Sequence, residues 1–240
     1  MKWLRRLLWT VGLLLVLAAG AFGGLYCYVS NPTVAVQALP AGLIGLDTPE
    51  GQALLASAEQ AGAADHAALS RAFQAQEKRS WCGVASAVVT LSALRGAPMA
   101  QSELFARDEA AAVRSWWQVT FGGMSLDALA GLLRAHGVPA TAHHADEGLA
   151  AFTAAVRRNL ATSGDYMIVN WRRDVIGEDG QIGHLSPISA FDPASERVLI
   201  LDVAAHVYPK TWVKISALFA AMDTVDGDGG KTRGWVEVGP

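Results

Sequence analysis

Cysteine is scarce in this chain of 240 residues, which has only Cys27 and Cys82. Cys27 lies within a long apolar run near the start, so Cys82 is the single thiol of the more polar remainder. Because that remainder has no second cysteine, a small disulfide-framed fold is excluded. A lone thiol that is kept without a partner is more often reactive than structural.

Charge is scarce as well, with 17% charged residues, 52% hydrophobic residues and a net charge of −3. This composition excludes a disordered chain and gives no basic surface for nucleic acid, so we expect no nucleic-acid partner. The length suits one targeting or membrane element followed by a single domain of about 200 residues. The oligomeric state is left open, with a homodimer among the alternatives.

Residues 7–29 are uncharged and almost wholly apolar, which is about long enough to cross a bilayer. Basic residues precede this run, so we expect the body on the far side, the periplasmic face of a bacterial inner membrane. Ala19-Gly-Ala21 resembles a signal-peptide cleavage site, and cleavage would leave the body free in the periplasm. The length of the run favours an uncleaved signal-anchor at 1–29. A proline-bearing linker at 30–40 and one domain at 41–240 follow.

The hydrophobic spacing changes from a helical to a strand-like period near residue 165. We expect the pair Trp116-Trp117 to pack in the core. Helices followed by an antiparallel sheet give an α+β domain, in which the N-terminal helical part that carries Cys82 packs against the sheet. The expected helices cover 49–61, 65–76, 83–94, 101–113, 126–136, 149–160 and 212–222, and the expected strands cover 165–171, 184–191, 197–203 and 232–238.

The strongest local signal runs from Gln76 to Leu94, where a helical pattern begins just after Cys82. The unpaired backbone N–H groups and the macrodipole at a helix N-terminus favour the thiolate over the thiol. Gly83 would let a substrate carbonyl approach the backbone, and the N–H of Cys82 would help to hold an oxyanion. The side-chain amide of Gln76 is a candidate second donor. The alternative is that Cys82 is a small buried hydrophobe.

A hairpin expected from two later strands supplies a base and its orienter. With residues 192–196 as its loop, Phe191 opposes Arg197, and His184 and Asp202 become diagonal neighbours on one face. The carboxylate would fix the imidazole tautomer and leave the other ring nitrogen for the thiol. A one-residue slip in register would put the two on opposite faces. The alternatives are a core histidine held by a backbone carbonyl and an aspartate that ends a strand.

Groups that resemble metal ligands carry less weight. His143 and His144 are adjacent, so they point to different sides, and with Asp146 they lack further spaced ligands; we expect an exposed turn there. The segment Asp226-Gly-Asp-Gly-Gly230 lacks the spacing and the closing glutamate of a calcium loop, so we expect a turn. We therefore predict no protein metal site.

Several motifs, taken in order, resemble the phytochelatin synthase family, whose catalytic domain is similar to the papain-like cysteine peptidases. The resemblance covers about residues 38–238, and several motifs in register are more specific than any one of them. It rests on Leu43-Ile-Gly-Leu-Asp-Thr-Pro-Glu-Gly51, Phe73-Gln-Ala-Gln76, Trp81-Cys-Gly-Val-Ala-Ser86, Ile168-Val-Asn170, Gly183-His-Leu-Ser-Pro187, Leu199-Ile-Leu-Asp-Val-Ala204 and Lys231-Thr-Arg-Gly234.

The resemblance implies a papain-like fold and a glutathione γ-glutamylcysteinyltransferase. It implies that Cys82 is the nucleophile, His184 the base and acid, and Asp202 the orienter. Gln76 is implied as an oxyanion donor. The substrate-binding residues that the motifs imply are Trp81, Gly83, Asn170 and Gly183.

The substrate that the resemblance implies is glutathione. Cys82 would attack the amide before glycine, release glycine and hold a γ-glutamylcysteinyl thioester, which water or a second glutathione resolves. No cofactor is required; a heavy-metal ion, cadmium or zinc, would enter as a glutathione thiolate complex, in keeping with metal detoxification. Plant members carry a cysteine-rich C-terminal region that this chain lacks, so we expect the short bacterial form, in which hydrolysis outweighs chain extension.

One position departs from the family, which usually has an arginine where this chain has Ala205. The change removes a fixed cation for a substrate carboxylate, and Lys210 and Arg233 are candidates to replace it. Two rival functions stay open. One is a papain-like peptide-processing peptidase of the kind that cleaves bacteriocin leaders, which shares a glutamine six residues before Cys-Gly. The other is a membrane-tethered thiol or metal-binding module.

Overall fold

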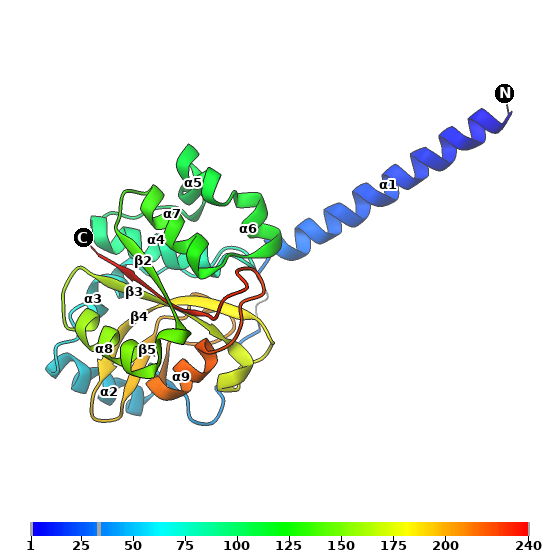
Figure 1. Ribbon diagram of the computed structural model, residues 1–240. Helices are drawn as coiled ribbons and strands as arrows, with labels where there is room; N and C mark the ends of the chain where they lie inside the picture. Colours follow the sequence, from blue (N-terminus) through cyan, green and yellow to red (C-terminus); the bar gives the residue numbers. More distant parts are fainter. Residues whose placement is uncertain (1, 33–34, 240) are drawn as a thin grey trace.

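The computed structural model describes residues 2–32 and 35–239. A long helix, α1 (Lys2–Ser30), projects from a compact body and contacts it near its C-terminal end (Figure 1). Among the described helices, α1 alone is long and apolar enough to cross a membrane. The helices of the body are α2 (Pro49–Gln60), α3 (His66–Ala72), α4 (Cys82–Arg95), α5 (Asp108–Val113), α6 (Trp116–Gly122), α7 (Leu126–Ala135), α8 (Leu149–Leu160) and α9 (Ile215–Met222), with short 3-10 turns at η1 (Gln101–Phe105), η2 (Ala145–Glu147) and η3 (Arg173–Ile176).

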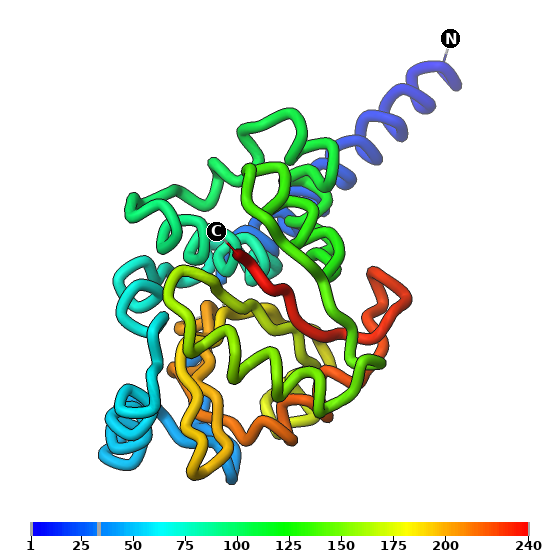
Figure 2. Tube along the Cα trace, turned by 60° about the vertical axis from the view of Figure 1, so that its left-hand side comes forward, coloured from blue at the N-terminus to red at the C-terminus, as the bar shows by residue number. Residues whose placement is uncertain are grey.

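Seven strands form one sheet in the order β1-β6-β5-β4-β3-β7-β2, and each neighbouring pair is antiparallel. The sheet and the helices that precede most of it confirm the predicted α+β class. The C-terminal strand β7 pairs with β2 and β3, which are far from it in sequence, and Figure 2 shows it running beside them. The strands are β1 (Ile44–Gly45), β2 (Ala140–His144), β3 (Tyr166–Arg172), β4 (Gly183–Asp192), β5 (Arg197–Ile200), β6 (Thr211–Lys214) and β7 (Gly234–Val238).

Helices cover both faces of the sheet, which is why its central strands are buried throughout. Successive side chains of a strand point to opposite faces. Ile168 accordingly lies in a core that α4 and α7 share, and Met167 and Val169 lie in a second core with α8 and α9. Figure 1 shows the same layers, with α4 and α7 on one side of the strands and α8 and α9 on the other. The first core fixes α4, and with it Cys82, against the sheet.

The β4–β5 hairpin departs from the predicted register near its loop and returns to it near the other end. Phe191 pairs with Val198 and not, as predicted, with Arg197. A β-bulge farther along shifts the register back by one residue, so the pairing of Ile188 with Ile200 is the predicted one. The two shifts cancel, and residues beyond the bulge keep the predicted facing.

Several local predictions are wrong. The helix expected over 212–222 begins only at Ile215, because the preceding β-branched and aromatic residues extend the sheet as β6. The tryptophans expected in the core form α6 instead, and Trp116 and Trp117 are 44% and 42% exposed. The helix expected over 101–113 is interrupted between η1 and α5.

The segment 30–40, predicted as a linker, runs along the body where it is described, and its residues 33 and 34 lie outside the described part. The N–H of Ala35 donates to the carbonyl of His206 at 3.2 Å, and the N–H of Gln37 donates to Val207 at 2.8 Å. The segment is therefore attached to the turn that follows Asp202.

Candidate active site

Cys82 is the first residue of α4, as the sequence predicted. Trp81 occupies the N-cap position and gives no side-chain cap, so the first N–H groups of the helix are not used by a capping side chain. Within the described residues, no backbone carbonyl accepts from the N–H of Cys82. The thiol is half-buried and lines a pocket, so it is not a sealed core residue. An anion formed at this position faces the positive end of the helix macrodipole.

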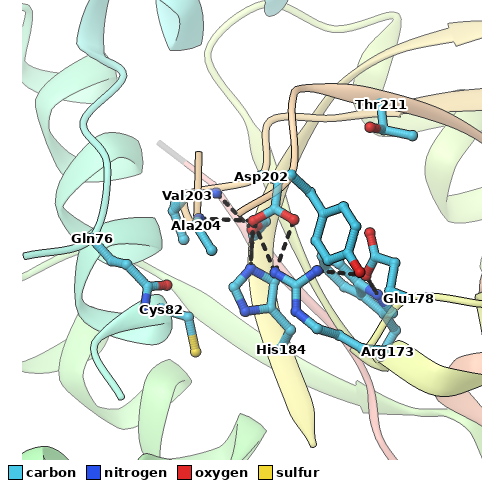
Figure 3. Close-up of polar contacts among 12 residues, drawn as sticks. Gln76, Cys82, Arg173, Glu178, His184, Asp202, Val203, Ala204 and Thr211 are labelled. Carbon is cyan, nitrogen blue, oxygen red and sulfur yellow. Dashed lines mark hydrogen bonds and ion pairs between the residues drawn. The ribbon is translucent and has the colours of Figure 1, made fainter. Parts of the chain in front are cut away.

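His184 and Asp202 meet across the hairpin. The His184 Nε2 lies 2.7 Å from Asp202 Oδ1, and both side chains are buried. The backbone N–H of Ala204 donates to the same oxygen at 2.8 Å, which holds the carboxylate in place. A carboxylate that accepts from Nε2–H leaves Nδ1 as the free acceptor of the neutral ring. Figure 3 shows that this second nitrogen faces the side on which Cys82 lies.

A serine on α4 ties the thiol to the strand that carries the imidazole. The Ser86 hydroxyl lies 2.7 Å from the carbonyl of Cys82 and 2.9 Å from the carbonyl of Leu185, which is next to His184. Because Ser86 is fully buried, this link fixes the distance between α4 and β4. The alignment of the sulfur and the imidazole thus depends on a contact between residues far apart in sequence.

Arg173 holds the other side of the carboxylate, and nothing in the sequence distinguished it. Its guanidinium donates to Asp202 at 2.9 and 3.2 Å and to Glu178, and all three side chains are buried. It also lies over the rings of Trp171 and Tyr208. The polar segment 174–183 connects two of the predicted strands, 165–171 and 184–191, and an arginine and a glutamate near such a loop resemble ordinary surface charges.

These charges shift the pKa values of the three groups. Burial alone raises the pKa of Cys82, but the hydrogen bond and charge of His184 outweigh burial and lower that pKa. Burial and the charge of Arg173 lower the pKa of His184, whereas the charge and hydrogen bond of Asp202 and the hydrogen bond of Cys82 bring it above its usual value. Burial opposes ionisation of Asp202 too, yet His184 and Arg173 hold its pKa well below its ordinary range. The site therefore favours a thiolate beside an imidazolium.

A pocket of about 420 Å³ opens in front of the thiol. Its wall combines apolar side chains with a few polar groups, which is the composition of a small-molecule site. Two of the predicted substrate-binding residues, Asn170 and Gly183, line it. The lining residues of the pocket are Tyr28, Val29, Arg79, Ser80, Cys82, Thr120, Phe121, Gly122, Gly123, Met124, Asn170, Ile182, Gly183, His184, Leu185, Asp226 and Asp228.

One side of the pocket carries charges of both signs. The Asn170 amide donates to Asp226 at 3.1 Å, and Asp226 belongs to the segment that was predicted as a plain turn. Gly183 is small for a visible reason, because a Cβ there would lie 2.9 Å from Nε of Arg233. That Nε is buried and has no partner among the described residues. The Asp226 carboxylate therefore lines the pocket, and the Arg233 guanidinium lies behind Gly183, outside the lining residues.

The two other predicted substrate-binding residues serve packing. A Cβ on Gly83 would lie 2.7 Å from the sulfur of Met124 and 2.9 Å from Leu185, so side chains fill the space that was predicted to admit a substrate carbonyl. Trp81 is buried, and its indole N–H donates to Thr120 at 3.0 Å. Both residues position α4, and neither lines the pocket.

Gln76 lies beside Cys82 (Figure 3), but the N–H groups of its side chain point into the loop between Gln76 and Cys82. They donate to the carbonyls of Lys78 and Arg79 at 2.9 and 2.8 Å. The buried amide oxygen finds no partner within the described residues. An oxyanion donor at this position requires one of these N–H groups to be released, so that role stays a prediction.

Of the two cations considered in place of the arginine missing at residue 205, the structure brings only one near the pocket. Ala205 itself is exposed. Lys210 lies over the ring of Phe73 at 4.3 Å and does not line the pocket. Arg233 is buried beside Gly183, as described above.

The histidine pair lies in strand β2 and not in the exposed turn that was predicted. His143 contacts Glu147 at 3.0 Å and stacks on Trp235. His144 bonds to the carbonyl of Thr232 at 2.6 Å on the other side of the strand. Within residues 2–32 and 35–239, no three His, Cys, Asp or Glu side chains converge as a metal site.

Comparison with known proteins gives a consistent result over most of the chain. The family model described as phytochelatin synthase matches residues 34–235. A protein named glutathione gamma-glutamylcysteinyltransferase 1 from Arabidopsis thaliana is 30% identical over 169 residues, which is 68% of this chain and 35% of that protein. One of the same name from Triticum aestivum is 30% identical over 195 residues, 79% of this chain and 39% of that protein. The protein named glutathione gamma-glutamylcysteinyltransferase 3 from Lotus japonicus is 28% identical over 169 residues, which is 68% of this chain and 35% of that protein. The chain thus spans little more than a third of these relatives.

Proposed function

Because the chain belongs to the phytochelatin synthase family, we propose that its body is a cysteine-dependent enzyme that transfers the γ-glutamylcysteinyl group of glutathione. The observation that carries the proposal is the line of Cys82, His184 and Asp202 at the edge of a pocket. A thiolate, a proton carrier and an orienting carboxylate are the three parts that acyl transfer by cysteine requires. We also propose that the arrangement of α4 against the sheet is papain-like.

In the first half of the reaction the thiolate of Cys82 attacks the amide carbonyl that precedes glycine. The oxyanion forms at the N-terminus of α4, where the N–H of Cys82 is available to donate. The imidazolium of His184 gives the proton on Nδ1 to the departing amine as the carbon–nitrogen bond breaks. Glycine leaves, and a γ-glutamylcysteinyl thioester stays on Cys82.

In the second half the neutral imidazole accepts a proton from the incoming nucleophile. Water yields γ-glutamylcysteine, and the amine of a second glutathione yields a longer peptide with a new amide bond. In both cases the carbon–sulfur bond breaks, and the thiolate–imidazolium pair is restored. Asp202 keeps its charge throughout, because His184 and Arg173 hold its pKa low.

The mixed charges of the pocket fit the head of the γ-glutamyl group, which has an ammonium and a carboxylate on one carbon. Asp226 is the acid that we assign to the ammonium, since Asp228 is already paired with Arg114 at 3.0 Å. We assign the carboxylate to Arg233, which lies behind the pocket residue Gly183 and whose Nε has no partner among the described residues. A cadmium or zinc ion enters this scheme bound to glutathione thiolates, as part of the substrate.

The apolar helix α1 supports a further part of the proposal, that the enzyme is anchored in a membrane with its body on the periplasmic side. The basic residues before the apolar run fix this orientation by the positive-inside rule. Cys27 lies in α1 and is exposed, and unlike its neighbours Tyr28 and Val29 it does not line the pocket. The chain therefore offers a natural control for experiments on its other thiol.

Product analysis tests the proposal. The full chain in detergent is incubated with glutathione, with and without cadmium, and the products are weighed by mass spectrometry. We expect glycine and γ-glutamylcysteine or longer peptides from the wild type. Cys82→Ala should lose this activity by a factor of roughly 10³ or more, and Cys27→Ala should keep it. Absence of glycine release from folded wild type, or cleavage of double-glycine leader peptides instead, would reject the proposal in favour of a peptidase.

A further inference from the structure

An exposed aromatic patch lies beside the candidate active site. It consists of Val113, Trp116, Trp117 and Phe121, on α5 and α6, and is called here the α6 patch. Trp117 packs against Phe121 at 4.4 Å between ring centroids and against Trp116 at 5.3 Å. The first three side chains are each more than 40% exposed. Clustered exposed aromatics on a folded body indicate an interaction surface.

The patch itself is free of charge, although α5 begins with the exposed residues Asp108 and Glu109. Residues 110–126 contain one charged side chain, Arg114, and this one is paired with Asp228. A surface that meets a protein partner usually has a charged or polar rim, whereas tryptophan with uncharged neighbours is typical of the boundary between water and lipid. The exposed tryptophans fit such a boundary, and their contact with Phe22 of α1 favours a bilayer over a protein as the occupant.

The α6 patch is continuous with the anchor helix. Phe22 of α1 stacks on Trp117 with 5.6 Å between centroids and lies 6.1 Å from Phe121. Figure 1 shows α6 at the end of the body from which α1 leaves. The apolar surface that begins on the membrane helix thus extends without a break onto the body.

The anchor is docked at its C-terminal end. The Arg79 side chain donates to the carbonyl of Tyr28 at 2.9 Å and lies over its ring at 4.1 Å, and its backbone N–H donates to Val29 at 3.2 Å. Arg79 precedes Cys82 by three residues in the same loop. These contacts set the orientation of the body relative to α1, and so relative to the membrane.

Helix geometry gives the depth of the patch. Phe22 is sixteen residues after Arg6, so it lies about 24 Å along the helix from that charge. The hydrocarbon core is about 30 Å thick, and Arg6 belongs at its near edge. Phe22 is therefore still on the lipid side of the far boundary, and the tryptophan stacked on it lies at that boundary.

We propose that the α6 patch is a second membrane contact, in which Trp116 and Trp117 enter the far interface of the bilayer beside α1. The proposal rests on the anchored topology proposed above. The pocket in front of Cys82 is lined in part by Tyr28 and Val29 of α1 and by Phe121 of α6, so one of its walls adjoins this contact.

Quenching by brominated lipid tests this contact in the full chain. The tryptophans of α1 are replaced (Trp3→Phe, Trp9→Phe), the chain is reconstituted into phosphatidylcholine vesicles, and vesicles with brominated and ordinary acyl chains are compared. In this background the remaining tryptophans outside the patch are buried. We expect quenching that is lost when Trp116→Phe and Trp117→Phe are added. Near-UV circular dichroism checks that each variant is folded.

A matched control moves the reporter to the other face of the sheet. Leu149, at the start of α8, is 39% exposed, close to the 42% of Trp117, and Leu149→Trp in the chain without patch tryptophans should show no quenching. Equal quenching at both positions, or none at the patch in vesicle-bound protein, overturns the proposal and leaves the anchor intact. A dimer in which the patch is covered would give the second of these results. Failure of the protein to float with vesicles overturns the anchor and the patch contact together, while glycine release tests the chemistry separately.

Discussion

Replacement of Arg173 by methionine is the sharpest test of the buried charges behind the site. The guanidinium lies between the carboxylates of Asp202 and Glu178, and each of the three side chains is at most 5% exposed. Methionine keeps much of the apolar stem and removes the charge. Two buried carboxylates would then face each other, and His184 would be the only cation still paired with either of them among the described residues.

Breaking a buried ion pair on one side costs about 3–5 kcal/mol, because the partner stays buried and uncompensated. A domain of this kind is stable by about 5–15 kcal/mol, so the loss is a large fraction of the total. The effect on chemistry has a definite sign. Arg173 lowers the pKa of both Cys82 and His184 through its charge, so Arg173→Met should move both limbs of the kcat/KM profile to higher pH.

Urea unfolding of the full chain in detergent, followed by near-UV circular dichroism, measures the first effect, and glycine release against pH measures the second. Arg158→Met is the matched control, because Arg158 pairs with Glu237 on the surface and should cost less than about 1 kcal/mol. Arg173→Lys should keep the limbs near wild type, and adding Glu178→Gln to Arg173→Met should recover part of the stability. If Arg173→Met costs no more than the surface control and leaves both limbs in place, the network does not hold Asp202 as argued.

Three further predictions follow from the site and the core. Asp202→Asn should move the alkaline limb of the kcat/KM profile to lower pH, because Asp202 raises the pKa of His184. A series of rates against pH in which this limb does not move contradicts the prediction. Gly183→Ala should displace Arg233 and reduce kcat/KM roughly tenfold or more, which corresponds to about 1.4 kcal/mol. Gly227→Ala, where an added Cβ would meet no other atom, should leave kcat/KM unchanged. Initial rates at several glutathione concentrations measure both effects. Burial raises the pKa of Asp65 from 3.8 to about 7, so the folded state binds the proton more tightly and stability should fall as pH rises between these values. In Asp65→Asn the urea midpoint should no longer be lower at pH 8 than at pH 4. If the midpoint still falls between these pH values, another group causes the pH dependence.

The sequence predicts the fold class because its periodicities are strong and local. The helix at Leu149–Leu160 and the start of α4 at Cys82 appear where they were expected. The short strands could not be predicted, since β1 has two residues and β6 has four, which also fit the helix that follows them. Which faces of the sheet are covered depends on long-range packing, and the sequence alone did not indicate that α8 and α9 cover the second face.

The site was predictable to the extent that it follows from strand register and helix ends. His184 and Asp202 were expected on one face from the hairpin, and they meet even though the loop is shifted by one residue, because the bulge restores the register. Arg173 and Glu178 were missed because their role comes from burial, which a polar loop does not indicate. Gly83 was assigned to the substrate from its missing Cβ, whereas that space belongs to Met124.

The charges of the site alternate in sign from one buried group to the next. Glu178, Arg173, Asp202, His184 and Cys82 form the series carboxylate, guanidinium, carboxylate, imidazolium and thiolate. Burial by itself would raise the pKa of Cys82 and favour the neutral thiol. The N-terminus of α4 and the adjacent imidazolium of His184 together oppose this effect. The imidazolium in turn stays protonated because Asp202 behind it stays ionised. Loss of an inner member leaves two like charges as neighbours, whereas loss of an end member does not. Variants of Arg173, Asp202 and His184 should therefore cost more stability than conservative variants of Glu178 or Cys82, an order that unfolding measurements on the five single variants can test.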